Sequence, residues 1–281
     1  MLTTPVLHRG GTVILTQKFD SEETLRLCEN KGVTILFGVP TMMQMMADAP
    51  NFDSVDLQKI RYAIVGGEPM AIPLIERWHE KEIPIRQGYG LTEFGPNVFS
   101  LNEKDAIRKK GSIGFPNFYI DTRVVNENAE DCAANEIGEL WLRGPACTPG
   151  YWNNEEATFK SIENGWFKTG DLVRFDEEGY FYVVDRKKDL FISGAENVYP
   201  AEIEAVLRNH PNIKEVAVIG VPDERWGEVG AAYVVLNEQD ATFEDTLSTH
   251  CKENLAKYKV PKYFRQIKEL PKSDSGKILK R

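Results

Sequence analysis

The first third of the sequence alternates short apolar runs with amphipathic segments, and this alternation strongly limits the folds that the chain can adopt. A helix is predicted from Asp20 to about Lys31, because Asp20 and Glu23 have capping spacing and Gly32 can end the helix. Further helices are predicted after Pro40 and over 72–80, and strands over 12–15, 33–37, 61–65 and 83–86. Strands that alternate with helices pair in parallel, so this region predicts a layered α/β sheet.

Two further segments show different patterns of apolar and turn residues. Short apolar runs separated by turn residues, at 111–114, 122–125, 139–143 and 180–184, predict a small antiparallel barrel or meander with little helix. The rest predicts a compact α+β domain, with helices over 200–208 and 243–256 and strands over 189–192, 216–219, 232–235 and 262–267. We therefore predict a partial α/β subdomain (1–95), a β-barrel subdomain (96–186) and a C-terminal domain (187–281). The charged run 185–189 is the expected hinge.

The charge is unevenly distributed. The chain carries a formal charge of −9, yet its last 31 residues carry +7, which leaves −16 for the rest. An acidic body argues against nucleic-acid binding. The basic tail is either a solvated lysine-rich segment or a surface that meets an anion.

Composition excludes several other classes of protein. No apolar run approaches the roughly 20 residues of a membrane-spanning helix, so no integral membrane segment is expected. The four cysteines and four histidines are scattered, which disfavours a zinc site or a disulfide framework and points to a reducing, cytoplasmic compartment.

A glycine-rich segment, Gly88-Tyr89-Gly90-Leu91-Thr92-Glu93, follows the fourth predicted strand. Its glycines allow a ligand to approach the backbone, and Tyr89 offers a flat face to a base. Thr92 offers a hydroxyl to a phosphate oxygen, and Glu93 offers a hard oxygen to Mg²⁺. The alternative is that the segment is only a turn.

Two later signals have the same ambiguity. Asp171 follows a Thr-Gly turn, where its carboxylate could accept from both ribose hydroxyls or could only stabilise the turn. Gly276-Lys277 is not a phosphate loop of the Walker type, because Ile278 follows it and the upstream glycine spacing is absent. Lys277 could still meet a phosphate.

These signals, in this order, resemble the adenylate-forming superfamily of acyl-CoA synthetases, peptide-synthetase adenylation domains and beetle luciferases, and fatty-acyl-CoA synthetases most of all. The matching segments are 67–69, 89–93, 138–144, 150–152, 169–171, 185–189, 194–202 and 276–277. The resemblance implies a ligase that converts a carboxylate, ATP and coenzyme A into acyl-CoA, AMP and pyrophosphate through an acyl-adenylate. It also implies that the C-terminal domain is a mobile lid.

The resemblance implies a nucleotide site with Mg²⁺. Gly67, Glu68 and Pro69 would line the adenine slot, and Tyr89, with Gly90 beside it, would stack on the base.

The phosphate and ribose contacts would follow. Thr92 would hold the α-phosphate of ATP or AMP, Glu93 would hold the metal, Asp171 would accept from the ribose, and Arg186 would lie near the same sugar.

The resemblance also implies roles for three residues of the lid. Lys188 would be the pivot of lid rotation, and Gly194 would belong to a loop that shapes the pantetheine tunnel. Lys277 would bridge the substrate carboxylate and the α-phosphate, which is the charge compensation that adenylation needs.

One part of the family pattern is missing. The Ser/Thr/Gly-rich loop that binds the β- and γ-phosphates has no counterpart in these 281 residues, since 8–12 is too short and lacks the hydroxyl run. The sequence therefore reads as the C-terminal portion of such an enzyme, inactive in adenylation by itself. Exposed sheet edges would favour association, for example as a homodimer.

Other functions stay open. The chain could be a non-catalytic or half-active remnant that binds nucleotide or coenzyme A, or an amino-acid or aryl-acid adenylating enzyme. The methionines at 42, 43, 45 and 46 would suit either an adaptable acyl pocket or an ordinary helix core.

Overall fold

The computed structural model describes residues 2–272 and 278–280, and the chain divides into two compact units. Unit 1 comprises residues 1–169 and 174–183, and unit 2 comprises residues 170–173 and 184–281. Each unit is described by itself. The predicted domain boundaries at residues 95 and 186 stay predictions.

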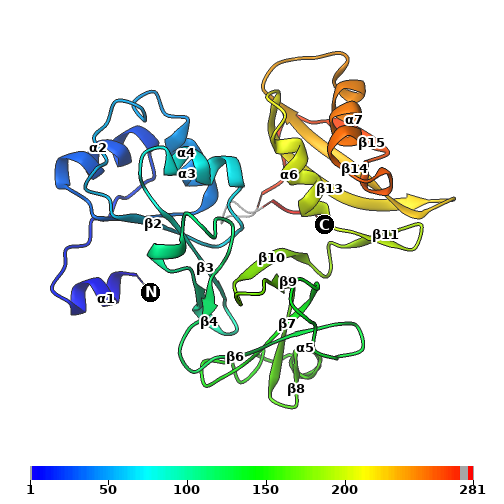
Figure 1. Ribbon diagram of the computed structural model, residues 1–281, viewed down its shortest axis with the longest axis horizontal. Helices are drawn as coiled ribbons and strands as arrows, with labels where there is room; N and C mark the ends of the chain where they lie inside the picture. The colour runs from blue at the N-terminus through cyan, green and yellow to red at the C-terminus, as the bar shows by residue number, and fades with distance from the viewer. Residues whose placement is uncertain (1, 273–277, 281) are drawn as a thin grey trace. The chain divides into compact units, whose positions relative to one another are not determined.

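The first sheet of unit 1 has the strand order β1-β2-β3-β4-β5 (Figure 1). β1, β2 and β3 pair in parallel, whereas β4 and β5 extend the sheet with antiparallel pairs. The strands are β1 (Ile35–Gly38), β2 (Tyr62–Val65), β3 (Ile85–Leu91), β4 (Gly95–Ser100) and β5 (Phe115–Pro116). The helices of this region are α1 (Thr3–His8), α2 (Ser21–Lys31), α3 (Pro40–Ala47), α4 (Ile72–His79) and the 3₁₀ turn η1 (Glu103–Asp105).

Helices α2, α3 and α4 pack with the parallel strands around one hydrophobic core. The Asp20 carboxylate accepts from the Glu23 N–H at 2.8 Å and starts α2, and Gly32, at φ 61°, ends it. Met43 and Met46 are fully buried in this core. Half of the methionine cluster is therefore helix core.

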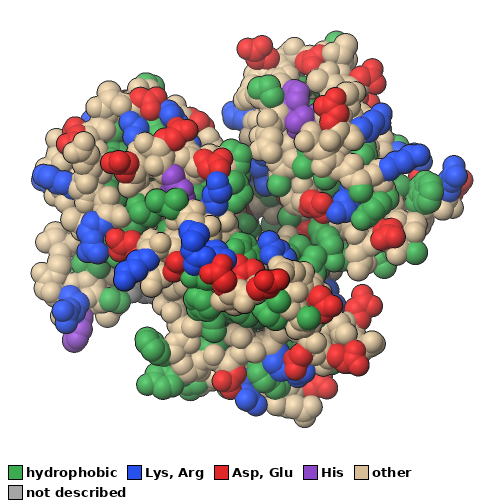
Figure 2. Space-filling view, viewed as in Figure 1, with side chains coloured by type: hydrophobic (Ala, Val, Ile, Leu, Met, Phe, Trp, Pro, Cys, Tyr) green, Lys and Arg blue, Asp and Glu red, His purple; other side chains and the backbone are tan. Residues whose placement is uncertain are grey.

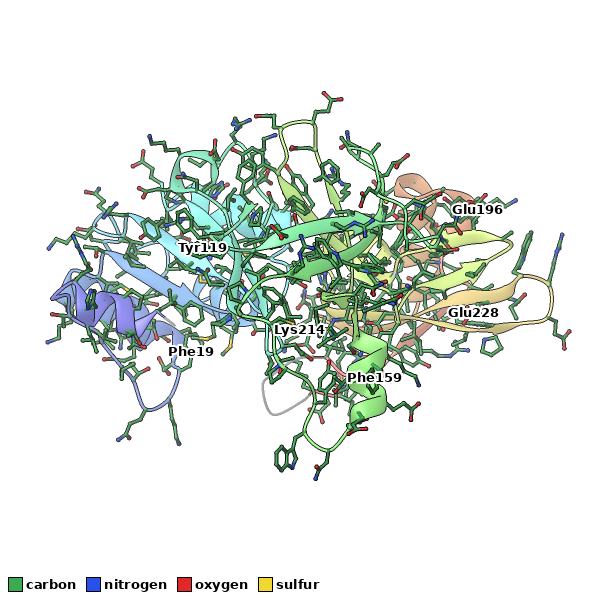
Figure 3. All side chains as sticks on the ribbon, turned by 90° about the horizontal axis from the view of Figure 1, so that it is seen from below. Phe19, Tyr119, Phe159, Glu196, Lys214 and Glu228 are labelled. Atoms are coloured by element: carbon green, nitrogen blue, oxygen red, sulfur yellow. The ribbon has the colours of Figure 1, made fainter. Side chains whose placement is uncertain are left out.

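The second sheet has the order β10-β9-β7-β6, with β8 paired to β9. β6 and β7 are antiparallel, as are β8 and β9, as the turn-rich sequence predicts. Figure 3 shows Phe159 on the short helix beside this sheet, where its side chain is 77% exposed. The elements are β6 (Asp121–Val125), β7 (Gly138–Arg143), α5 (Glu155–Ser161), β8 (Ile162–Glu163), β9 (Trp166–Phe175) and β10 (Phe181–Arg186).

Unit 2 contains a third sheet of order β12-β11-β14-β13, with β15 paired to β14. The long β13–β14 hairpin is antiparallel, and helices α6 and α7 pack with it around a separate core. On the face drawn in Figure 2, acidic and basic side chains are interspersed rather than gathered by sign. The elements are β11 (Phe191–Ser193), β12 (Glu196–Val198), α6 (Pro200–Arg208), β13 (Ile213–Asp223), β14 (Gly227–Leu236), α7 (Phe243–Asn254), η2 (Lys257–Lys259) and β15 (Tyr263–Gln266).

The predicted fold class, a parallel α/β region followed by an antiparallel sheet and an α+β unit, is confirmed. Two local predictions are wrong. Among the described residues, the run 12–15 is not a strand, and Leu15 is 82% exposed. Of the run 111–114, Gly114 pairs in an isolated bridge rather than in a strand. The segment 96–186 has little helix, as predicted: its α-helix is α5, of seven residues.

A third correction concerns Gly88, Tyr89 and Gly90. They lie inside β3 rather than in a loop after it, because β4 pairs with them from Gly88↔Ser100 to Leu91↔Gly95. Among the described residues, no helix is long and apolar enough to cross a membrane.

Candidate active site

The loop after β2 lies beside β3 at the carboxyl ends of the parallel strands, where open α/β sheets bind ligands. A Cβ on Gly66 would lie 3.2 Å from the carbonyl oxygen of Gly88, so the two backbones are in close contact. Gly67 has φ +95°, a conformation that favours glycine. Glu68 and Pro69 are exposed.

A buried amide holds this loop in place. The Gln87 side chain is 4% exposed, and its Oε1 accepts from the Met70 N–H at 2.8 Å. The sequence analysis did not single out Gln87. Its signal in the sequence was weak: Gln87 is a polar residue that directly follows the strand predicted over 83–86.

Tyr89 and Gly90 occupy the edge of the same site. The Tyr89 ring is half-buried and meets Phe99 edge-on, with ring centroids 5.8 Å apart. A Cβ on Gly90 would lie 2.5 Å from the carbonyl carbon of Pro96, so this position accepts no side chain without movement of the backbone. The glycine therefore permits close pairing of β3 and β4.

Thr92 and Glu93 form the turn between β3 and β4. The Tyr151 hydroxyl donates to Glu93 Oε1 at 2.9 Å, and the Thr148 N–H donates to the Glu93 carbonyl oxygen at 2.7 Å. Burial, together with this hydrogen bond to Glu93, raises the pKa of Tyr151, so the phenol stays a donor. The Glu93 carboxylate is thus fixed by its hydrogen bond from Tyr151 and lies next to the exposed Thr92.

This arrangement fits Mg²⁺. The ion takes oxygen ligands and is usually held by one or two carboxylates together with substrate phosphates. Glu93 Oε2 is not used by the bond to Tyr151, and the Thr92 side chain is exposed next to it.

A second group of predicted residues lies in unit 2. Arg186 Nε is 3.5 Å from Asp171 Oδ1, and the Lys187 N–H donates to the Gly170 carbonyl oxygen at 2.8 Å. The side chain of Asp171 is 14% exposed, whereas that of Arg186 is 54% exposed. The structure thus brings together the two residues that the resemblance assigns to the ribose.

Asp185, next to Arg186, is 7% exposed and was not predicted as a site residue. Its carboxylate accepts from the Arg186 N–H at 2.7 Å and from the Ala201 N–H, in the first turn of α6, at 2.8 Å. Burial raises its pKa, and the backbone hydrogen bonds oppose that rise. Asp185 therefore caps α6 from outside the helix.

Lys188 is exposed in the turn that follows β10, where the Asp189 N–H donates to the Arg186 carbonyl oxygen at 3.0 Å. This places the predicted pivot in a turn.

Gly194 lies in the turn between β11 and β12, and its N–H donates to the Trp226 carbonyl oxygen at 2.9 Å. A Cβ there would lie 2.7 Å from the Trp226 ring. Glu228, labelled in Figure 3, supports the preceding strand by accepting from the Ile192 N–H at 3.1 Å. Lys277 lies outside the described residues, so its predicted role stays a prediction.

Comparisons with known proteins match both halves of the chain. Residues 1–152 match the model of the AMP-binding enzyme family, and residues 202–277 match that of the AMP-binding enzyme C-terminal domain. A feruloyl-CoA synthase of Amycolatopsis sp is 44% identical over 280 residues, which are 100% of this chain and 57% of that protein. A long-chain-fatty-acid–CoA ligase of Mycobacterium tuberculosis is 41% identical over 281 residues, 99% of this chain and 56% of that protein.

Solved structures of a relative have a similar fold. The o-succinylbenzoate coenzyme A synthetase of Bacillus subtilis in complex with ATP and magnesium ion superposes with a TM-score of 0.86 at 38% identity, over 97% of this chain and 56% of that one. The same enzyme with its acyl-adenylate intermediate gives a TM-score of 0.88. The chain thus spans little more than half the length of these relatives. Because one family model matches more than half of its residues, the chain belongs to the AMP-binding enzyme family.

Proposed function

We propose that the full gene product is an acyl-CoA synthetase that uses ATP and Mg²⁺. In the first half-reaction a substrate carboxylate oxygen attacks the α-phosphorus of ATP, and pyrophosphate leaves. In the second, the coenzyme A sulfur attacks the acyl carbonyl carbon of the acyl-adenylate, AMP leaves, and the thiol proton goes to solvent. The observation that carries the proposal is the β2–β3 edge, where a glycine loop, Tyr89, Thr92 and the held Glu93 carboxylate adjoin one another.

Each residue has a role in this proposal. The backbone of Gly67, Glu68 and Pro69 lines the adenine slot, with Tyr89 against the base and Gly90 leaving the backbone bare. Thr92 donates to the α-phosphate, and Glu93 holds Mg²⁺, which supplies charge neutralisation at the phosphates when bound.

In unit 2, the Asp171–Arg186 pair binds the ribose, because a carboxylate can accept from both of its hydroxyls. Lys188 is the pivot and Gly194 the loop residue of the thiol-transfer state. Lys277 neutralises the two anions that adenylation brings together.

The proposal must also name the class of carboxylic acid that the enzyme activates. The relatives are named for feruloyl, o-succinylbenzoyl and long-chain fatty acyl groups. Aryl acids are therefore candidate substrates beside the fatty acids that the sequence resemblance suggested. A panel of these three acid classes and of amino acids, with coenzyme A thioester as the readout, decides among them. Amino-acid activation without thioester formation would contradict the proposal.

Lys277→Ala is the decisive variant. We expect it to slow ATP–pyrophosphate exchange roughly 10²- to 10³-fold, the effect of losing one electrostatic donor. Thioester formation from supplied acyl-adenylate should stay at the wild-type rate. Lys268→Ala, an exposed lysine of the same basic segment, is the control. Equal loss of both half-reactions would refute the role of Lys277.

A further inference from the structure

A glutamate is buried on the inner face of helix α6. Glu204 is 5% exposed, and its Oε1 accepts from the Val218 N–H at 2.8 Å and lies 2.7 Å from Lys280 Nζ. Its Oε2 lies 3.3 Å from a guanidinium nitrogen of Arg208. Glu204 thus joins α6, strand β13 and the C-terminal end of the chain.

The described residues on either side of 273–277 are also tied to unit 2. Lys272 and Ile278 form an antiparallel bridge, and the Leu279 N–H donates to the Pro271 carbonyl oxygen at 2.8 Å. Leu270, 5% exposed, packs in a small apolar cluster with Ile278. The Lys280 side chain is 17% exposed and directed to Glu204.

The contribution of this buried ion pair to the stability of the fold is a weak explanation for its presence. Desolvation of two charges commonly offsets their attraction, and an apolar pair of similar size is often as stable. A directional ionic contact instead fixes where one particular residue lies. Lys280 follows Lys277 by three residues, which span at most about 10 Å of extended chain.

The contact also adjoins the expected hinge, 185–189. Asp185 caps α6 at Ala201, one turn before Glu204 on the same helix. Helix α6 therefore holds Asp185, in the expected hinge, at its first turn and Lys280 at its second.

We propose that Glu204 is a positioning residue for the adenylation half-reaction: it holds Lys280, which follows the proposed catalytic Lys277 by three residues in the sequence, in place beside α6. The inference rests on the proposed function. Glu204 touches no reacting atom and acts only through Lys280.

The first test uses the 281-residue chain and needs no activity. Glu204→Gln keeps an acceptor for the Val218 N–H but removes the charge that holds Lys280. We expect hydrogen exchange at the Leu279 amide to accelerate about tenfold or more, while the amides of β13 and β14 keep their protection. Lys280→Met should do the same. Glu202→Gln, two residues earlier on α6 and paired with Lys259 at 2.7 Å, is the matched control and should change nothing at Leu279.

The second test uses the full gene product. Glu204→Gln and Lys280→Met should each slow acyl-adenylate formation about 10- to 100-fold, since small misplacements of catalytic groups have effects of this size. Thioester formation from supplied acyl-adenylate and the thermal midpoint should match the Glu202→Gln control. The double variant should be no slower than either single variant, because both remove one contact.

Several outcomes would overturn the inference. Unchanged exchange at Leu279 would show that Glu204 does not hold the C-terminal end. Equal slowing of both half-reactions, or additive effects in the double variant, would make Glu204 merely structural. Absence of adenylate formation in the wild type with every acid class would instead sink the proposed function, and with it the positioning role, whereas the exchange result would still stand on its own.

Discussion

At the scale of single residues, the hydroxyl of Tyr151 decides how Glu93 is presented, because it holds Oε1 at 2.9 Å. Tyr151→Phe removes this donor and leaves the ring. We expect the Mg²⁺ concentration for half-maximal adenylation to rise roughly fivefold, which corresponds to about 1 kcal/mol for one hydrogen bond to a charged group at a partly exposed site. Titration of ATP–pyrophosphate exchange with Mg²⁺ measures it.

The control is Tyr119→Phe, because the Tyr119 side chain is 86% exposed and is not one of the residues assigned to the site. An unchanged Mg²⁺ requirement in Tyr151→Phe would mean that the hydroxyl does not orient Glu93.

The sequence indicated candidate residues by their chemistry, but not the contacts that hold them. Motif spacing pointed to Glu93 and Asp171 as candidates, since the residue types that suit a nucleotide can be read locally, and their roles stay predictions. Gln87, Tyr151 and Asp185 were not predicted as site residues, because each acts through a contact with a segment far away or beyond a turn. Such contacts exist only after folding, and hydropathy patterns do not report them.

At the scale of elements, two glycines of the β3–β4 hairpin, Gly88 and Gly90, differ in whether they have room for a side chain. A Cβ on Gly90 would meet the backbone of Gly95 and Pro96 at 2.5–2.7 Å, whereas a Cβ on Gly88 would lie at an ordinary 3.6 Å from the Phe99 carbonyl oxygen. Gly90→Ala should therefore lower the free energy of unfolding by about 2–3 kcal/mol, as overpacking does. Gly88→Ala, the matched control, should change it by less than about 1 kcal/mol. Urea unfolding of both variants measures the difference, and equal effects would contradict this reading of the hairpin.

The same hairpin explains one error in the predicted elements. Glycines after an apolar run ordinarily signal a turn, but antiparallel pairing with β4 extends β3 through Gly90. By contrast, α2 and α6 were predicted closely, because caps and first-turn prolines act locally. The run 12–15 failed for the opposite reason: β-branched residues favour a strand but need a partner to form one.

At the scale of the whole molecule, unit 1 and unit 2 have separate hydrophobic cores, so changes within one unit should register in its own unfolding transition. Unit 1 contains a group of neighbouring ion pairs. Arg108 pairs with Asp105 at 3.0 Å and with Glu178 at 2.6 Å, and Lys109 pairs with Asp176 at 2.7 Å. These ion pairs connect the segment after β4 to the β9–β10 turn.

Acid should weaken unit 1 through these pairs. Hydrogen bonds from Lys109 and Arg108 lower the pKa of Glu178 below 4.5, and the hydrogen bond from Arg108 lowers that of Asp105 below 3.8. A lowered pKa means that the unfolded chain binds protons first, so the stabilisation is complete above pH 4.5 and is lost as the pH falls through the lowered values.

Thermal unfolding from pH 6 to pH 3 should show the midpoint of unit 1 falling, and less steeply in Arg108→Met. Arg26→Met, which removes an exposed ion pair with Glu22 on α2, should keep the wild-type slope. If Arg108→Met and wild type lose stability in parallel over this range, the Arg108 contacts do not set the acid sensitivity of unit 1.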